Sequence, residues 1–160
     1  MKTIVLLDRI RSMYNVGSFF RTCDGAGVAK LYLTGYTAFP PRSQITKTAL
    51  GAEETVPWEY DEDVMKVIEK LKNDGVIIVS VEKNERSVDF STVHFKEDDT
   101  VCFIFGNEVE GVSEEIQEVS DFIIHLPMRG EKASLNVAVS GGAILYHDFT
   151  NQLHSKNQSV

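Results

Sequence analysis

Long apolar runs are missing from this chain of 160 residues. No stretch approaches the roughly 20 apolar residues that a membrane-spanning helix needs, and no basic leader precedes an apolar run and a small-residue cleavage site at the N-terminus. We therefore expect a soluble, unexported, cytoplasmic protein without membrane contact. With 42% hydrophobic residues, the chain is still long enough to bury roughly 70% of its unfolded surface in one domain.

Cysteine is scarce as well. Cys23 lies in a helical context and Cys102 in an apolar strand, and neither has a neighbouring Cys or His at metal-ligand spacing. The histidines form no ligand spacing either, at positions His94, His125, His147 and His154. The sequence therefore predicts two reduced, buried thiols and no metal site.

The common phosphate-binding fingerprints are absent. No Gly-x-Gly-x-x-Gly turn follows the first predicted strand, and no Gly-Lys-Ser or Gly-Lys-Thr loop occurs anywhere in the chain. Ordinary NAD, FAD and ATP sites therefore lose most of their support.

Positive charge is in short supply, since the formal net charge is −8. On average this disfavours a nucleic-acid partner, because phosphate binding needs local positive potential. The charge is uneven, however: residues 1–50 carry a net +5 and the remaining 110 residues carry −13. Four basic residues fall in predicted loops beside Tyr14, Tyr36 and Phe39: Arg9, Arg11, Arg42 and Lys47. They form either an RNA-binding footprint, in which basic groups and rings meet phosphates and bases, or a solvated basic face.

Apolar runs and helical periodicities alternate along the chain, separated by short connections. Strands are predicted over residues 3–7, 31–33, 76–81, 101–105 and 122–126. Helices are predicted over residues 15–26, 43–50, 61–73, 113–119 and 133–149, with Asn15 and Ser113 as N-caps. We expect an α/β fold in one domain, residues 1–150, with an open parallel sheet sandwiched by helices and a polar tail over residues 151–160.

The last predicted helix has an unusual composition. Gly141 and Gly142 stand side by side among apolar residues, although an interior glycine costs a helix roughly 1 kcal/mol against alanine. The pair indicates that another element approaches this helix closely, or simply that it packs tightly in the core.

Ligands of open α/β sheets bind beyond the carboxyl ends of the strands. Three loops follow predicted strands there, over residues 9–15, 106–111 and 126–130. Their glycines permit tight turns around a ligand, or serve turn geometry alone: Gly106, Gly111 and Gly130.

The same loops resemble a known family. The residues that carry the resemblance are, in order, Asn15-Val16-Gly17 with Arg21-Thr22, FIFGNEVEGV at 103–112, LPMRG at 126–130 and SLNV at 134–137. They are similar to the three motifs of the TrmH (SpoU-type) RNA ribose 2′-O-methyltransferases in the SPOUT superfamily. The resemblance covers nearly the whole chain, and its third motif is the most specific.

This resemblance implies a fold, a cofactor and a reaction. The fold would contain a C-terminal trefoil knot, with S-adenosylmethionine (AdoMet) bound in the knot of an obligatory homodimer, and Gly141 with Gly142 would allow close contact with the partner subunit. The reaction would be methylation of an RNA ribose 2′-hydroxyl. A tRNA substrate is favoured over rRNA, because relatives acting on tRNA are often this compact. Two alternatives remain open: RNA base methylation, as in other SPOUT branches, and a non-catalytic knotted module that binds RNA or the cofactor.

Arg21 aligns with the arginine that this family uses at the reaction centre, as a base or as a phosphate anchor. The anchor is favoured because an arginine stays protonated at neutral pH, and its guanidinium would bind a phosphate beside the target nucleotide with two hydrogen bonds. The alternative is an ion pair on the helix surface with Asp24, three residues along.

Four further residues are assigned to the reaction centre by the same resemblance. Ser134 and Asn136 would fix the hydroxyl with neutral donors and acceptors, and Ser134 can also cap the last helix. Glu108 would order the active-site loops or pair with a basic group, or is a solvated acid. Asn15 would cap its helix and shape the site.

A cofactor pocket is expected where relatives use backbone groups and apolar side chains around adenine. The corresponding residues are Phe105, Gly106, Asn107, Gly111, Leu126, Met128, Gly130, Ser134 and Leu135. Met128 and Leu135 fit the hydrophobic core equally well, and Asn107 stands where many relatives carry a small residue.

Overall fold

The computed structural model describes residues 1–157, with the side chains of residues 1–147, 149 and 150. Its centre is one seven-stranded sheet in which every neighbouring pair of strands is parallel. The strand order is β3 (Trp58–Asp61), β2 (Lys30–Thr34), β1 (Lys2–Asp8), β6 (Thr100–Phe105), β4 (Ile77–Val81), β7 (Phe122–His125) and β5 (Val88–Asp89). The predicted parallel sheet is therefore confirmed.

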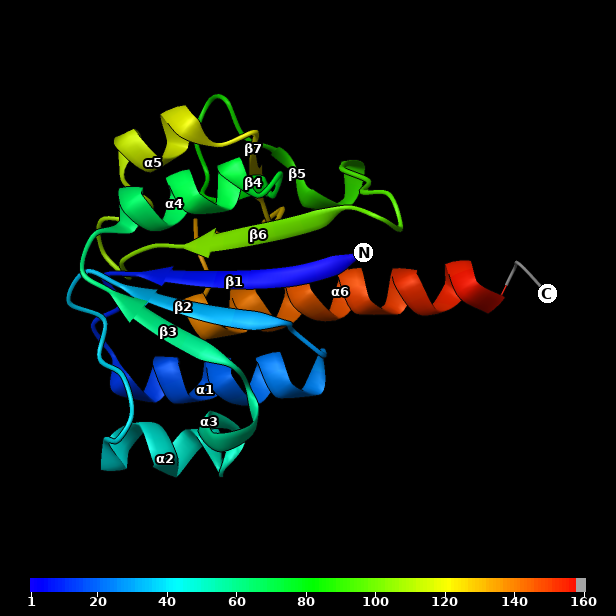
Figure 1. Ribbon diagram of the computed structural model, residues 1–160. Helices are drawn as coiled ribbons and strands as arrows, with labels where there is room; N and C mark the ends of the chain where they lie inside the picture. Colours follow the sequence, from blue (N-terminus) through cyan, green and yellow to red (C-terminus); the bar gives the residue numbers. More distant parts are fainter. Residues whose placement is uncertain (158–160) are drawn as a thin grey trace.

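Helices cover both faces of this sheet (Figure 1). One face carries α1 (Met13–Gly25), α2 (Ser43–Ala49), α3 (Ala52–Thr55) and α6 (Val137–Asn157). The other face carries α4 (Val64–Asn73) and α5 (Glu114–Val119), and a 3₁₀ turn spans Phe90–Thr92. The α/β fold class is confirmed, while the trefoil knot stays a prediction of the resemblance.

Alternation along the strands produces a core on each side of the sheet. Val5 and Leu7 of β1 belong to the cluster that includes Phe19 of α1 and Ile144 of α6. Their neighbours along β1 point the other way, because successive side chains of a strand alternate between its faces, and pack with α4 and α5. Both faces of the central strands are thus buried, as their continuous apolar sequence predicts.

The edges of the sheet differ from the prediction. Sequence analysis missed β3 and β5, and it placed Asp61 in a helix, whereas Asp61 ends β3 and pairs with Thr34. The helix α4 begins only at Val64, where the side chain of Asp63 accepts hydrogen bonds from the backbone of the first turn. Edge strands this short and polar have too few residues for a recognisable period.

The predicted N-cap of α1 was wrong, and the cap considered as an alternative for α6 is not the one used. In α1 the N-cap is Ser12, whose Oγ accepts from the amide of Asn15 at 3.3 Å, so the side chain of Asn15 is available for other contacts. In α6 the N-cap role falls to Asn136 instead of Ser134, because Asn136 Oδ1 accepts from the amides of Ala138 and Val139. The helix consequently starts four residues later than predicted, and it continues to Asn157 instead of ending at Phe149.

The two adjacent glycines of α6 face different surroundings. A Cβ at Gly141 would collide with the ring of Phe19, whereas a Cβ at Gly142 would meet nothing within 4 Å. The close approach predicted from the glycine pair is therefore made by α1 of the same chain at Gly141. Gly142 leaves a small open place on the surface of α6.

Both cysteines are buried free thiols, as predicted, and burial raises the pKa of each. Among residues 1–157, no helix is long and apolar enough to cross a membrane. The described part of the chain also holds no cluster of three or more His, Cys, Asp or Glu side chains suited to a metal ion.

Candidate functional site

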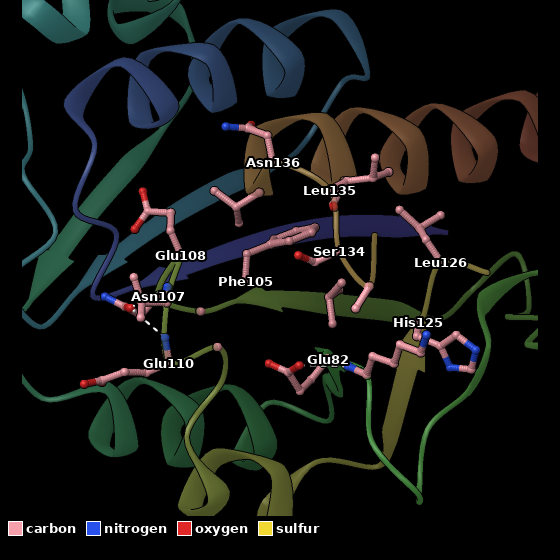
Figure 2. Close-up of a pocket in the computed structure, with 18 of the residues that line it drawn as sticks. Glu82, Phe105, Asn107, Glu108, Glu110, His125, Leu126, Ser134, Leu135 and Asn136 are labelled. Carbon is pink, nitrogen blue, oxygen red and sulfur yellow. Dashed lines mark hydrogen bonds between the residues drawn. The ribbon is translucent and has the colours of Figure 1, made fainter. Parts of the chain in front are cut away.

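A pocket of about 310 Å³ lies at the carboxyl ends of β4, β6 and β7 (Figure 2). We call it the edge pocket. Three segments line it. Val81–Lys83 lie at the end of β4, and Phe105–Gly111 lie at the end of β6. The third segment runs from the end of β7 into the first turn of α6 and contributes His125, Leu126, Met128, Ala133, Ser134, Leu135, Asn136, Val137 and Ser140. Parallel strands bring these segments together because all their carboxyl ends meet at one edge.

Most residues predicted to bind the cofactor line this pocket. They are Phe105, Gly106, Asn107, Gly111, Leu126, Met128, Ser134 and Leu135. Gly130 is the exception, since it is exposed and does not belong to the lining. Met128 and Leu135 are absent from both buried core clusters, and Leu135 is exposed, which favours the pocket over the core for these two side chains.

Two glycines fix the shape of the loop after β6. A Cβ at Gly106 would collide with the backbone of Gly111 and Val112, so the loop closes directly against its own start. Gly111 has a φ of +72°, in the left-handed region that favours glycine, and a Cβ there would strike the carboxylate of Glu82. At Gly106 the chain has no room for another residue unless the pocket wall moves, whereas at Gly111 another residue would be strained by the left-handed backbone and the Glu82 carboxylate would have to shift.

Glu108 connects this loop to the start of α1. Its carboxylate accepts hydrogen bonds from the amides of Arg11 (2.8 Å) and Ser12 (3.0 Å) and from Asn15 Nδ2 (2.9 Å). Burial raises the pKa of Glu108, but these hydrogen bonds outweigh it, so the pKa lies below its ordinary value. Of the three roles considered for Glu108, ordering the loops is the one that these contacts support.

Asn15 continues the connection to α6. While its Nδ2 donates to Glu108, its Oδ1 accepts from Asn136 Nδ2 at 3.2 Å. Figure 2 shows Glu108 and Asn136 on the same side of the pocket, with Ser134 and Phe105 closer to its middle. Four of the five predicted reaction-centre residues therefore gather at the edge pocket.

The side chain of Asn107 makes hydrogen bonds through both its oxygen and its nitrogen in the wall of the pocket. Its Oδ1 accepts from the amides of Val109 and Glu110, while its Nδ2 donates to the carbonyl of Arg9 (2.9 Å) and to Tyr36 Oη (2.7 Å). A side chain at this position, where many relatives of the resembled family carry a small residue, thus ties the pocket wall to the loops after β1 and β2.

Arg21 lies apart from the other predicted reaction-centre residues. It lines a second, shallower groove, the Arg21 groove, whose other residues are Ser18, Thr22, Lys47, Thr48 and Tyr146. Six residues separate Arg21 from Asn15 along one helix, which is a rise of about 9 Å and a turn that points the two side chains in different directions. The alternative ion pair with Asp24 is absent among the described residues, where Asp24 accepts from Thr55.

The basic residues of the first 50 positions do not form one uniform surface. Arg9 binds Asp8 (2.9 Å) and Glu110 (3.1 Å), and the hydrogen bond to Asp8 raises its pKa, so its charge is used within the chain. Arg11 and Arg42 are exposed, and Arg42 precedes α2. Lys47 was assigned to a loop although the predicted helix over residues 43–50 contains it. It lies on α2, with its Nζ 6.0 Å from the ring centre of Tyr14.

Sequence analysis missed part of the lining, above all Glu82 and His125. Glu82 Oε2 accepts from the amide of Val112 at 2.9 Å, and His125 Nδ1 lies 2.9 Å from Ser87 Oγ. Both residues stand at the carboxyl end of a predicted strand. Applying the same strand-end argument to the strand over residues 76–81 would have found Glu82.

Comparison with known proteins adds independent findings. A model of the SpoU rRNA Methylase family matches residues 2–146. A tRNA (guanosine(18)-2′-O)-methyltransferase from Aquifex aeolicus is 36% identical over 146 residues, which are 89% of this chain and 66% of that protein. The structure of the A. aeolicus TrmH/SpoU tRNA modifying enzyme matches with a TM-score of 0.86 at 30% identity, over 97% of this chain and 77% of that one.

A solved structure with a cofactor is similar as well. The AdoMet-bound rRNA methyltransferase from Sinorhizobium meliloti matches with a TM-score of 0.85 at 29% identity, over 91% of this chain and 54% of that one. The chain spans 58 to 66% of the length of the curated relatives that it matches.

Proposed function

This chain belongs to the SpoU rRNA Methylase family, and on that premise we propose that it transfers a methyl group from AdoMet to a ribose 2′-hydroxyl of tRNA. The observation that carries the proposal is the edge pocket, because the loops that form it hold the family motifs. The relative that is 36% identical is named as acting on a guanosine 2′-oxygen of tRNA, and this supports tRNA over rRNA.

The edge pocket fits such a cofactor in size and in chemistry. Its volume of about 310 Å³ lies at the lower end of the range for small-molecule sites, about 300–1,000 Å³. Its lining combines the apolar side chains of Phe105, Leu126 and Leu135 with Gly106 and Gly111, which have no side chain. When bound, AdoMet supplies an activated methyl group on a sulfonium, so the protein has mainly to hold the nucleophile in line.

We assign the orientation of the ribose hydroxyl to Asn136 and Ser134, neutral groups at the pocket. Asn136 holds one position because it caps α6 and donates to Asn15. Glu108 and Asn15 then act as positioning residues, since Asn15 bonds Asn136 and Glu108 bonds Asn15 and the loop before α1. This arrangement fixes a hydroxyl without placing a charge beside it.

We further propose that the chain works as a homodimer through α6. Val139, Gly142 and Tyr146 of α6 lie at spacings of three and four, which form one stripe on a helix. The exposed Leu135, which precedes the first turn of α6, continues this stripe at its start. The stripe begins at the edge pocket and ends at the Arg21 groove. In an antiparallel pairing about a two-fold axis, residue i contacts residue j and j contacts i, so the pocket of one subunit meets Arg21 of the partner subunit. Arg21 would there anchor a phosphate beside the target nucleotide.

Methyl transfer with tritium-labelled AdoMet tests the function directly. Purified chain is incubated with bulk tRNA and, separately, with rRNA, and the labelled RNA is treated with alkali. Because alkaline cleavage requires a free 2′-hydroxyl, we expect labelled tRNA whose modified nucleotide resists cleavage.

Three other results would contradict the proposal. A labelled nucleotide that alkali still cleaves indicates base methylation. Tight AdoMet binding without transfer to any RNA indicates a non-catalytic module. Label on rRNA alone contradicts the tRNA assignment.

Phosphate contacts also make RNA affinity depend on salt. We expect tRNA affinity to fall steeply as salt rises and Arg11→Glu to weaken it, since Arg11 is exposed beside the pocket loops. Binding that does not respond to salt would contradict a footprint on residues 1–50.

A further inference from the structure

Tyr36 presents an aromatic ring that the protein itself leaves unused. It lies in the loop between β2 and α2, and it is 60% exposed. The two other rings near the basic loops are occupied: Tyr14 faces Lys47, and Phe39 packs against Tyr60 at 4.4 Å between ring centres. Among the described residues, the ring of Tyr36 has no ring–ring and no cation–π contact.

The ring is nevertheless held in one place. Tyr36 Oη accepts a hydrogen bond of 2.7 Å from Asn107 Nδ2, and Asn107 is only 4% exposed. Asn107 itself is fixed by the amides of Val109 and Glu110 and belongs to the wall of the edge pocket (Figure 2). An exposed ring anchored by its hydroxyl loses little further freedom when something stacks on it.

The neighbouring loops bring positive charge to the same edge of the sheet. The loop of Tyr36 is tied to the loop after β1, because Ile10 N donates to Thr37 Oγ1 at 3.0 Å. Arg11 follows directly in that loop, and Arg42 closes the loop of Tyr36; both are exposed and neither has an ion pair among the described residues. An open ring, together with exposed guanidinium groups on the same and the adjoining loop, is the combination with which proteins hold unstacked nucleotides.

We propose that Tyr36 is a stacking platform for a nucleobase next to the nucleotide whose ribose enters the edge pocket. This inference rests on the proposed function and adds the residue that holds the RNA bases. The base belongs to a single-stranded loop or an opened stem, because a base within a duplex offers no free face. Tyr36 tolerates any base in this role, since every base has a π-face, and it fixes where the chain of nucleotides crosses the rim of the pocket.

Three variants of the full chain test the platform. Tyr36→Leu removes the aromatic face but keeps apolar volume, Tyr36→Phe keeps the face but loses the hydrogen bond to Asn107, and Phe122→Leu is the matched control. Phe122 is also an exposed ring, but it starts β7 at the opposite end of the strands from the edge pocket. Each variant is measured for bulk tRNA affinity at fixed salt, for the KM and kcat of methyl transfer, and for AdoMet affinity.

Stacking predicts a graded result. We expect Tyr36→Leu to weaken tRNA binding and raise KM by about tenfold, and Tyr36→Phe to stay within about threefold of the unmodified chain. The control Phe122→Leu and the AdoMet affinity of all variants should be unchanged.

Several outcomes would overturn the inference. One is a Tyr36→Leu protein that binds tRNA as tightly as the unmodified chain. Another is a Tyr36→Phe protein that loses as much tRNA affinity as Tyr36→Leu, since that result assigns the effect to the hydrogen bond alone. A Tyr36→Leu protein that loses its dimer by sedimentation would assign the ring to a subunit contact. If the unmodified chain binds tRNA but transfers no methyl group, the proposed function fails while the binding measurement still decides the role of Tyr36.

Discussion

The edge pocket and the Arg21 groove differ in how their polar side chains are held. At the pocket, Glu108, Asn15 and Asn136 form a continuous chain of hydrogen bonds across three elements. In the groove, Arg21 and Lys47 are exposed and have no ion pair among the described residues. The chain therefore holds the polar side chains of the pocket by contacts within itself, whereas the two charges of the groove have no such ion pairs, and under the proposed function they meet a phosphate of the RNA.

We expect the largest effect on the edge pocket from a side chain at Gly106. In Gly106→Ala the new Cβ collides with the backbone of Gly111 and Val112, so the pocket wall must move. We expect AdoMet affinity to fall by about 100-fold, which corresponds to about 3 kcal/mol of overpacking. Calorimetric titration measures the effect, and Gly130→Ala is the control, because a Cβ there meets nothing within 4 Å. Equal affinities for the two variants would contradict the role of this loop.

The groove is tested through Arg21. We expect Arg21→Ala to lower kcat/KM for tRNA by about 30-fold, as the loss of a charged hydrogen bond predicts, with AdoMet affinity unchanged. Mixing this variant with Asn136→Ala sharpens the comparison. In an equal mixture, half of the dimers contain one subunit of each variant. If Arg21 acts across the dimer, each of these mixed dimers has one complete site out of two, so activity recovers to about a quarter of normal. No recovery in re-equilibrated mixtures would place Arg21 and the pocket within one subunit.

The two adjacent glycines of α6 test two different contacts: Gly141 tests packing within one chain, and Gly142 tests the contact between the subunits of the proposed dimer. We expect Gly141→Ala to lower the free energy of unfolding by about 1–3 kcal/mol, because the buried ring of Phe19 must shift. Gly142→Leu meets open space within one chain, so we expect it to fold but to weaken the dimer by about tenfold through overpacking at the interface. Chemical unfolding and sedimentation measure the two effects. A Gly142→Leu protein that is folded, dimeric and active would refute the close contact.

The smallest expected effect is the pH dependence of the pocket network. Since the pKa of Glu108 is lower in the folded protein than its ordinary value of 4.5, its ionised form stabilises the fold at neutral pH. That contribution is complete above about pH 4.5 and is lost as pH falls through the lowered pKa of the folded state. Glu108→Gln does not titrate, so the difference in Tm between the two proteins should shrink on acidification. A difference that is constant from pH 7 to pH 3 would show that the charge has no role.

Local sequence predicted the parts of the site that lie in one segment. Apolar strands followed by glycine loops placed the pocket at the carboxyl ends of β6 and β7. The family resemblance then named nine cofactor residues, of which eight line this pocket. The same reasoning found both buried cysteines and the principal helices.

Contacts between distant segments were beyond such reasoning. Ser12 and Asn136 cap their helices although Asn15 and Ser134 are equally good capping residues, because the chain assigns Asn15 to Glu108 and Ser134 to the pocket wall. Residue type alone does not distinguish these uses. The short edge strands β3 and β5 are likewise defined by the partners they pair with.

The amino-acid sequence by itself determined the parallel α/β sheet, its two buried faces and the glycine loops at its carboxyl edge, since these follow from local periodicity and backbone freedom. Only the tertiary structure decided that Asn107 holds Tyr36, that Gly141 meets Phe19 while Gly142 stays open, and that Arg21 lies away from the pocket. The physical reason is that a side chain's partner depends on the direction in which its element points it. That direction is set by the packing of elements far apart in the chain.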